Sequence, residues 1–154
     1  MLKGVSMYVL DITSTELSLL DSKDNNITWN GLDATHNLII NVIGNGGTAE
    51  WDPQQQTNGD DAYTLYNFVD ASTVKTKQLF TGSILAVNST VDQGGGDIQG
   101  NVIANGLVQD AELHFGSDGN GNYQGTVPMA TTEPAPIAAL GLGALVLVRR
   151  RKRA

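Results

Sequence analysis

Two stretches of the chain repeat one pattern of apolar and polar positions, 18 residues apart. Residues 80–86 read Phe-Thr-Gly-Ser-Ile-Leu-Ala, and residues 98–104 read Ile-Gln-Gly-Asn-Val-Ile-Ala. In each copy, large apolar residues alternate with polar ones over the first five positions, which is the period of a β-strand and not of a helix. A strand pattern that returns after 18 residues predicts one coil of a parallel β-solenoid, in which equivalent residues stack about 4.8 Å apart.

The alternation assigns each position of the repeat to a face. The apolar positions should point into the core: Phe80, Ile84, Ala86, Ile98, Val102 and Ala104. The polar positions should point outward: Thr81, Ser83, Gln99 and Asn101. Gly82 and Gly100 share the inward parity and leave room for close backbone approach. Leu85 and Ile103 fall on the outer parity, so either another element covers them or they form an exposed apolar strip suited to binding.

The residues between the two copies suit the corners of a coil. Residues 88–97 include Gly94, Gly95 and Gly96, and glycine reaches positive φ at little cost, while Asn and Asp cap turns. A second interpretation stays open, in which the two copies form an antiparallel meander and resemble each other by chance. The parallel solenoid is favoured because five of seven positions match.

Further segments read as strands. Residues 38–43 are a short apolar run bounded by Asn and Gly, which is typical of a buried strand, and residues 25–32 read as turn, strand and turn. Residues 63–68 predict another strand, and Tyr66 lies 18 residues before Ile84, so a third coil would fit there.

The N-terminal third gives weaker signals. Residues 7–12 predict a strand, whereas residues 14–20 begin like a helix, with Glu16 in the first turn, but are too short to assign. Residues 51–61, with Pro53 and three glutamines, predict a polar loop. The N-terminus lacks the apolar core and cleavage site of a secretory signal.

Charge and composition exclude several classes of site and of binding partner. The chain of 154 residues has no cysteine, which excludes disulfides and thiolate metal sites. Five of its nine basic residues form the cluster Arg149–Arg153, so four lysines face sixteen acidic residues in the rest of the chain. Such an acidic body argues against nucleic acid as a partner, because it could not neutralise phosphates.

The C-terminus has the layout of a membrane segment. Residues 116–132 are rich in glycine and predict a linker, and residues 133–154 combine Glu133-Pro134, an apolar run and the basic cluster. The helix predicted over 136–148 has twelve consecutive apolar residues, which span about 18 Å against about 30 Å of hydrocarbon. The basic cluster would lie in the cytoplasm and the body outside. The alternative, an interfacial or calmodulin-type helix, lacks its polar face.

This tail resembles the PEP-CTERM sorting signal of exported proteins in exopolysaccharide-producing Gram-negative bacteria. The matching residues are Glu133, Pro134, Arg149, Arg150, Arg151, Lys152 and Arg153, and Thr132 stands where the signal has its first proline. The resemblance implies transient insertion in the inner membrane, processing by an exosortase-type protease or transpeptidase, and delivery to the cell surface.

The body resembles the C-terminal half of the choice-of-anchor A family over about residues 36–115. Five blocks agree in order: residues 38–42, 65–68, 80–86, 100–104 and 111–115. Val87 stands where that family usually has proline after Leu-Ala. The resemblance implies a β-solenoid surface adhesin of which residues 1–115 are the C-terminal part, with the export signal and first coils encoded upstream.

Several residues could carry chemistry, but none is singled out. Asp118-Gly-Asn120-Gly-Asn122 has the alternating oxygens of a calcium loop, yet Tyr123 replaces its sixth-position glycine and Met129 its bidentate acid, so a linker is favoured. Asp60-Asp61 and Asp92 with Asp97 read as solvated turn acids. His36 and His114 have no evident acid partner, and Gly94-Gly95-Gly96 lacks the lysine of a phosphate loop.

The sequence therefore predicts an all-β protein: a parallel β-solenoid (β-helix) fragment, a linker and one short C-terminal transmembrane helix. We expect a non-enzymatic adhesion or binding module at the cell surface, with exopolysaccharide as a candidate partner and with no catalytic, metal or cofactor site. Two alternatives are a polysaccharide-active β-helix enzyme, which would need a cluster of acids or bases on one face, and an ice-binding-like domain. For ice, Thr81 with Ser83 and Gln99 with Asn101 are too irregular a face.

Overall fold

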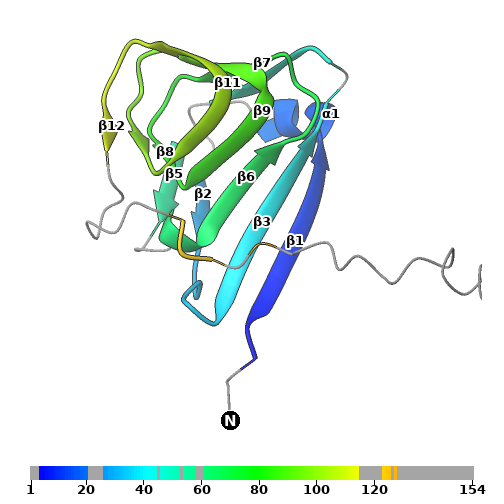
Figure 1. The fold of residues 1–154 in the computed structure, drawn as a ribbon, viewed down its shortest axis with the longest axis vertical. Coiled ribbons are helices and arrows are strands. Elements are labelled where there is room, and N and C mark those ends of the chain that lie inside the picture. The colour runs from blue at the N-terminus through cyan, green and yellow to red at the C-terminus, as the bar shows by residue number, and fades with distance from the viewer. Residues whose placement is uncertain are drawn as a thin grey trace, which may run out of the picture.

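Successive strands lie side by side and parallel, so the backbone curls into stacked coils (Figure 1). The computed structural model describes residues 4–20, 26–44, 46–52, 54–57, 61–114, 123–125 and 127. The elements are β1 (Ser6–Thr13), α1 (Ser14–Leu20), β2 (Asn26–Trp29), β3 (His36–Ile43), β4 (Thr48–Trp51), β5 (Gln54–Thr57), η1 (Asp61–Tyr63), β6 (Thr64–Phe68), β7 (Thr73–Thr76), β8 (Phe80–Thr81), β9 (Ser83–Gln93), β10 (Ile98–Gln99), β11 (Val102–Gln109) and β12 (Leu113–His114). The predicted all-β class is confirmed.

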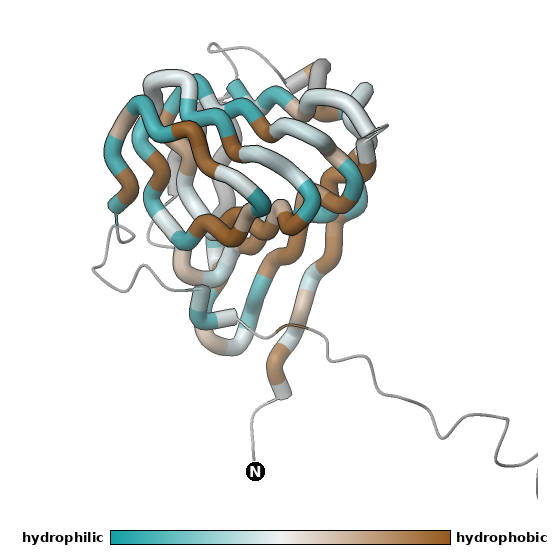
Figure 2. The backbone as a smooth tube through the Cα atoms, turned by 45° about the horizontal axis from the view of Figure 1, so that its top comes forward, coloured by the Kyte–Doolittle hydropathy of each residue, from teal (hydrophilic) through white to brown (hydrophobic). Residues whose placement is uncertain are grey.

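The coils present three walls. The first wall consists of β1, β3, β6 and the first halves of β9 and β11. The second wall consists of β4, β7 and the second halves of β9 and β11, which run through both walls. The third wall consists of β8, β10 and β12, and β2 pairs with β5 in a separate parallel ladder. Hydrophobic segments of successive coils lie next to one another (Figure 2).

The strand register confirms the 18-residue repeat. Phe80 pairs with Ile98 and Ile84 with Val102, both in parallel, so the antiparallel meander is wrong. Tyr66 pairs with Ile84, which confirms the third coil. The earlier coils are longer: the paired positions are 30 residues apart between Ser6 and His36 and 26 apart between Leu38 and Thr64.

Three aromatic rings fill the centre of the stack. Trp51 comes from the second wall, Tyr66 from the first and Phe80 from the third, and all three are buried. Their ring centroids are 4.9 Å (Trp51 to Tyr66), 5.7 Å (Trp51 to Phe80) and 4.8 Å (Tyr66 to Phe80) apart, with edge-to-face geometry. Such pairs contribute about 0.5–1.5 kcal/mol each beyond their buried area.

The two repeated glycines stand at the corner between the third and first walls. Gly82 has φ +113° and Gly100 has φ +147°, values that L side chains rarely adopt. A Cβ on Gly82 would lie 2.9 Å from Cε2 of Tyr66, and one on Gly100 would collide with the Gly82 carbonyl of the preceding coil. The predicted close approach is confirmed, and it is an approach of one coil corner to the next.

Two outward positions of the repeat are not exposed. Thr81 and Ser83 were expected at the surface, but they are only 2% and 3% exposed, so that prediction is wrong. The Ser83 hydroxyl accepts the Asn101 amide of the next coil at 3.3 Å, because it lies between neighbouring coils at the corner. Alternation gives the side of the strand on which a residue lies, and it does not show what covers that side.

The stretch 51–61, predicted as a polar loop, contains a strand in its described part. Trp51 is buried at the end of β4, and residues 54–57 form β5, which pairs with β2. Polar residues occur in this strand because the ladder is formed by backbone groups, which any non-proline side chain permits.

Residues 14–20, left unassigned from the sequence, form α1. Thr13 begins it with a capping box: the Thr13 amide donates to Oε2 of Glu16 at 2.7 Å, and the Glu16 amide donates to Oγ1 of Thr13 at 3.2 Å. The Thr13 amide, and the Thr13 hydroxyl that donates to the same carboxylate oxygen at 2.9 Å, lower the pKa of Glu16. Leu17 anchors the helix in the core, and α1 lies against β4.

No helix among the residues given above is long and apolar enough to cross a membrane. The helix predicted over 136–148 lies outside the described residues.

The corner glycines give a stability test. Gly100→Ala adds a backbone collision to an unfavourable φ, each worth about 1–3 kcal/mol, so we expect it to lower the free energy of unfolding by about 3 kcal/mol or more. Gly95→Ala is the matched control, because Gly95 also has positive φ (+116°) but open space around its Cβ. It should cost about 1–2 kcal/mol. Equal urea midpoints for the two variants would contradict the stacked corner.

Candidate interaction surface

The outward side chains of the first wall form three rows that run across its strands. The first row consists of Val9, Ile39, Leu65 and Ser83. The second row consists of Asp11, Asn41, Asn67, Leu85 and Ile103. The third row consists of Ile43, Val69 and Val87, two residues after Asn41, Asn67 and Leu85; Val69 lies just beyond β6, and its amide donates to the Val42 carbonyl at 3.1 Å. We call these three residues the apolar ridge.

The middle row begins as a ladder of amides. Asn41 donates from Nδ2 to Oδ1 of Asp11 at 2.7 Å, and Asn67 donates from Nδ2 to Oδ1 of Asn41 at 2.9 Å. Each bond joins two neighbouring coils, since the three residues are in register. The ladder therefore stabilises the outer face, and it also divides the first row from the apolar ridge.

Residues of the first two rows line an apolar groove of about 150 Å³ that is open to solvent. Its lining residues are Val9, Ile39, Asn41, Leu65, Asn67, Leu85 and Val127. Leu85 thus lies in the same groove as Val127, a later segment of the chain, which matches the expectation that another element covers it. Ile103 is 58% exposed, which is the other outcome.

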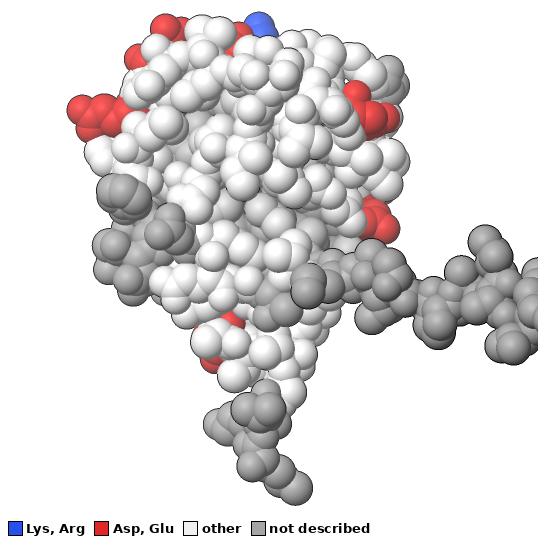
Figure 3. Space-filling view, viewed as in Figure 1, with Lys and Arg blue, Asp and Glu red and all other residues white. Residues whose placement is uncertain are grey.

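The apolar ridge lies on the outer face of the first wall, whose rows contain one charged residue, Asp11, on the edge strand β1. Val87 is 57% exposed, and Ile43 and Val69 are exposed as well. In the space-filling view the centre of this side carries no charged atoms, and the carboxylates lie at its rim (Figure 3). An apolar face with a single carboxylate, on an otherwise acidic body, is a candidate for binding.

The second wall presents a different outer face. Thr48, Thr73 and Thr90 stack in register, and the next row consists of Glu50, Lys75 and Asp92. The Lys75 ammonium lies 3.7 Å from Oδ2 of Asp92, and Lys77 forms an ion pair with Glu50. This face is polar and charged, with one regular row of hydroxyls.

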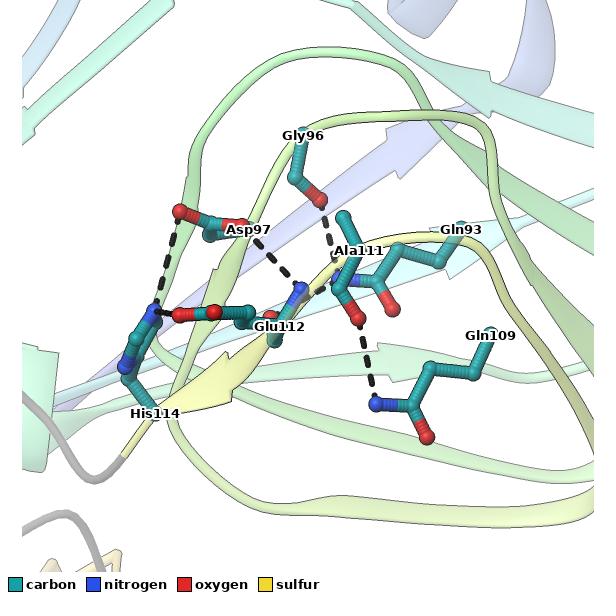
Figure 4. A network of polar contacts seen from close by, with 7 residues as sticks. All are labelled: Gln93, Gly96, Asp97, Gln109, Ala111, Glu112 and His114. Carbon is teal, nitrogen blue, oxygen red and sulfur yellow. Dashed lines mark hydrogen bonds and ion pairs between the residues drawn. The ribbon is translucent and has the colours of Figure 1, made fainter.

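A polar network closes the last corner, between the second and third walls (Figure 4). Gln93 is buried and donates from Nε2 to the carbonyls of Gly96 (3.0 Å) and Glu112 (2.9 Å). Gln109 is in register with Gln93 and donates to the Ala111 carbonyl at 3.1 Å. The two glutamines therefore satisfy turn carbonyls at the same corner of successive coils.

His114 lies beside this network with two carboxylates. Its Nε2 is 3.0 Å from Oε2 of Glu112 and 3.6 Å from Oδ2 of Asp97, and Asp97 also accepts the Glu112 amide at 3.1 Å. Among the described residues, no group of three His, Cys, Asp or Glu side chains is arranged to hold a metal ion. The cluster links the last two coils.

The histidines do have acid partners, contrary to expectation. His36 lies 3.1 Å from Asp33, three residues earlier, a spacing that the sequence could have shown. The partner Asp97 of His114 is seventeen residues distant in sequence and becomes a neighbour only through coil stacking. Asp92, another candidate acid, forms an ion pair with Lys75. In the glycine run 94–96, the Gly94 amide donates to the Thr76 carbonyl at 2.7 Å, so this residue forms part of a corner turn.

The remaining candidate residues lie outside the described structure. These are Asp60, the Asp61 side chain, the possible calcium loop Asp118–Asn122, and the sorting-signal residues Thr132, Glu133, Pro134, Arg149, Arg150, Arg151, Lys152 and Arg153.

Asp33 gives a pH-dependent prediction. The hydroxyl and amide of Thr35, each 2.7 Å from Oδ1, and then His36, lower the Asp33 pKa from 3.8 to about 2. Because the folded-state pKa is depressed, its contribution to stability is present above about pH 4 and is lost as the pH falls towards 2. We expect Asp33→Asn to remove this part of the acid dependence of urea unfolding. Thr35→Val should return the carboxyl titration seen by NMR towards 3.8, and a wild-type midpoint already near 3.8 would refute the assignment.

Comparison with known proteins identifies a family. A family model described as "Putative Ice-binding-like adhesive domain" matches residues 2–115. No curated protein matches the chain, and no solved structure does.

Proposed function

Because the chain belongs to the family of ice-binding-like adhesive domains, we propose that it is an adhesion module of the cell surface that binds exopolysaccharide through the outer face of its first wall. The family suggests a non-enzymatic role, in which the body holds a ligand without converting it. The resemblance of residues 36–115 to choice-of-anchor A adhesins supports the same function.

The observation that carries this proposal is the apolar ridge on a face with a single carboxylate. Four lysines against sixteen acids give residues 1–148 a strongly negative charge, which repels acidic polymers. The face built by Ile43, Val69, Val87 and Ile103 has no such repulsion and offers apolar area to the non-polar faces of sugar rings. Binding there costs little desolvation of charge.

Two pairs of lysine substitutions test the binding face. Val69→Lys with Val87→Lys places charge on the apolar ridge, and we expect retention of the full chain on immobilised exopolysaccharide to fall at least tenfold. Thr73→Lys with Thr90→Lys is the matched control on the second wall and should leave retention unchanged. If the control pair weakens retention and the ridge pair does not, the assigned face is wrong.

We propose further that the tail is a sorting signal: the apolar segment enters the inner membrane, the basic cluster stays in the cytoplasm, and an exosortase-type enzyme processes the chain. The order of Glu133-Pro134, apolar run and Arg149–Arg153 supports this.

In a host with such an enzyme, we expect Glu133→Ala with Pro134→Ala to leave the chain at its full mass in the membrane fraction. Thr131→Ala, just outside the motif, should be processed normally. Intact-mass measurement of surface and membrane fractions distinguishes the two variants, and equal processing of both would contradict the sorting signal.

Ice binding is the second candidate function, favoured by the regular row Thr48–Thr73–Thr90 and by the family description. The adjacent charged row, Glu50, Lys75 and Asp92, weakens it, because charged groups hold water strongly. If this function holds, thermal hysteresis is abolished by Thr73→Lys and not by Val69→Lys, the reverse of the result expected for adhesion.

A further inference from the structure

The chain returns to the first coils after its last strand. β12 ends at His114 in the last coil, yet Tyr123–Gly125 and Val127 lie against the first wall, where their orange trace passes in front of the sheet (Figure 1). We call these four residues the strap. The Gln124 amide donates to the Ala62 carbonyl at 2.8 Å, and the Tyr63 hydroxyl donates to Oε1 of Gln124 at 3.4 Å.

The groove suits Val127 of the strap in chemistry, because both are apolar. Val127, which is 52% exposed, lines the groove together with Val9 of β1, Ile39 of β3 and Leu65 of β6, so this side chain borders a groove that spans neighbouring coils. Further back along the strap, Tyr123 is half-buried, and this burial raises the pKa of its phenol.

We propose that the groove is the docking site of the chain's own strap, held in cis, and that the strap makes the C-terminal tail depart beside β1. This rests on the proposed function, in which the tail attaches the module to a cell. Without the strap the tail would start from β12, at the other end of the stack. With it, the tail starts from the first coils.

The position of the strap would fix how the module is oriented relative to the cell. By residue 127 the chain has run back from the last coil to the groove, whose lining extends from Leu85 of β9 to Val9 of β1. The end formed by β11, with exposed Ile103, Leu107 and Val108, then points away from the attachment point. The strap therefore presents that end and the adjoining apolar ridge outward, while the end at β1 faces the cell.

Paired cysteines test the docking, and the chain suits them because it contains no cysteine of its own. Val127→Cys is combined with Val9→Cys, which lines the same groove, in the purified full chain. The matched control combines Val127→Cys with Val108→Cys on the second wall; Val9 and Val108 are 52% and 48% exposed, so the two cysteines are equally accessible. We expect at least tenfold more intramolecular disulfide in the groove pair, measured by intact mass and non-reducing electrophoresis.

Each other result overturns the proposal. A disulfide that joins two chains would mean that the groove takes the strap of a second copy, and equal yields in both pairs would mean that the strap is not docked. Gln124→Pro removes the amide that donates to Ala62, whereas Gln124→Ala keeps it. The proline variant should reduce the groove disulfide and lower the Tyr123 titration towards 10, while the alanine variant should not.

These measurements do not depend on adhesion. A docked strap in a chain that fails to bind exopolysaccharide would refute the proposed function and leave the docking intact. A binding-competent chain with an undocked strap would do the opposite.

Discussion

The edge-to-face contact of Trp51, Tyr66 and Phe80 is the interaction on which the rest of the structure depends. Parallel stacking joins each coil to its neighbours, but it does not join one wall to the next across the interior. The three rings come from three different walls and meet at 4.8–5.7 Å between centroids. Since Gly82 has no side chain, the Tyr66 ring can lie against the corner backbone.

Packing in the interior requires apolar side chains at every second position of a strand. The outward positions are not under this constraint, so their side chains can differ from one wall to another. Inward positions carry apolar side chains such as Ile40, Val74 and Val91. Outward positions form a face with an apolar ridge and a single carboxylate, Asp11, on the first wall, and rows of hydroxyls and ion pairs on the second. Because successive coils keep register, one substitution per coil builds a row, and a binding face can change without disturbing the core.

Different elements cap the two ends of the stack. At the first coils, α1 lies against β4 with Leu17 in the core, and the strap covers part of the outer face of the first wall. At the last coils, Gln93 and Gln109 satisfy the turn carbonyls, and His114 adds contacts to two carboxylates. The polar corner therefore links the short last coils to one another.

The sequence by itself determined the parts that depend on local periodicity. Alternation over 80–86 and 98–104, repeated after 18 residues, was enough to predict parallel stacking, the inward residues and the function of Gly82 and Gly100, since a shared register places equal positions at equal heights. Only the tertiary structure decided the longer coils of 30 and 26 residues, the strand at 54–57, the burial of Thr81 and Ser83, and the pairing of His114 with Asp97. These features depend on contacts between residues that are far apart in the chain. Because the spacing of such residues differs from coil to coil, the sequence contains no period from which they could be predicted.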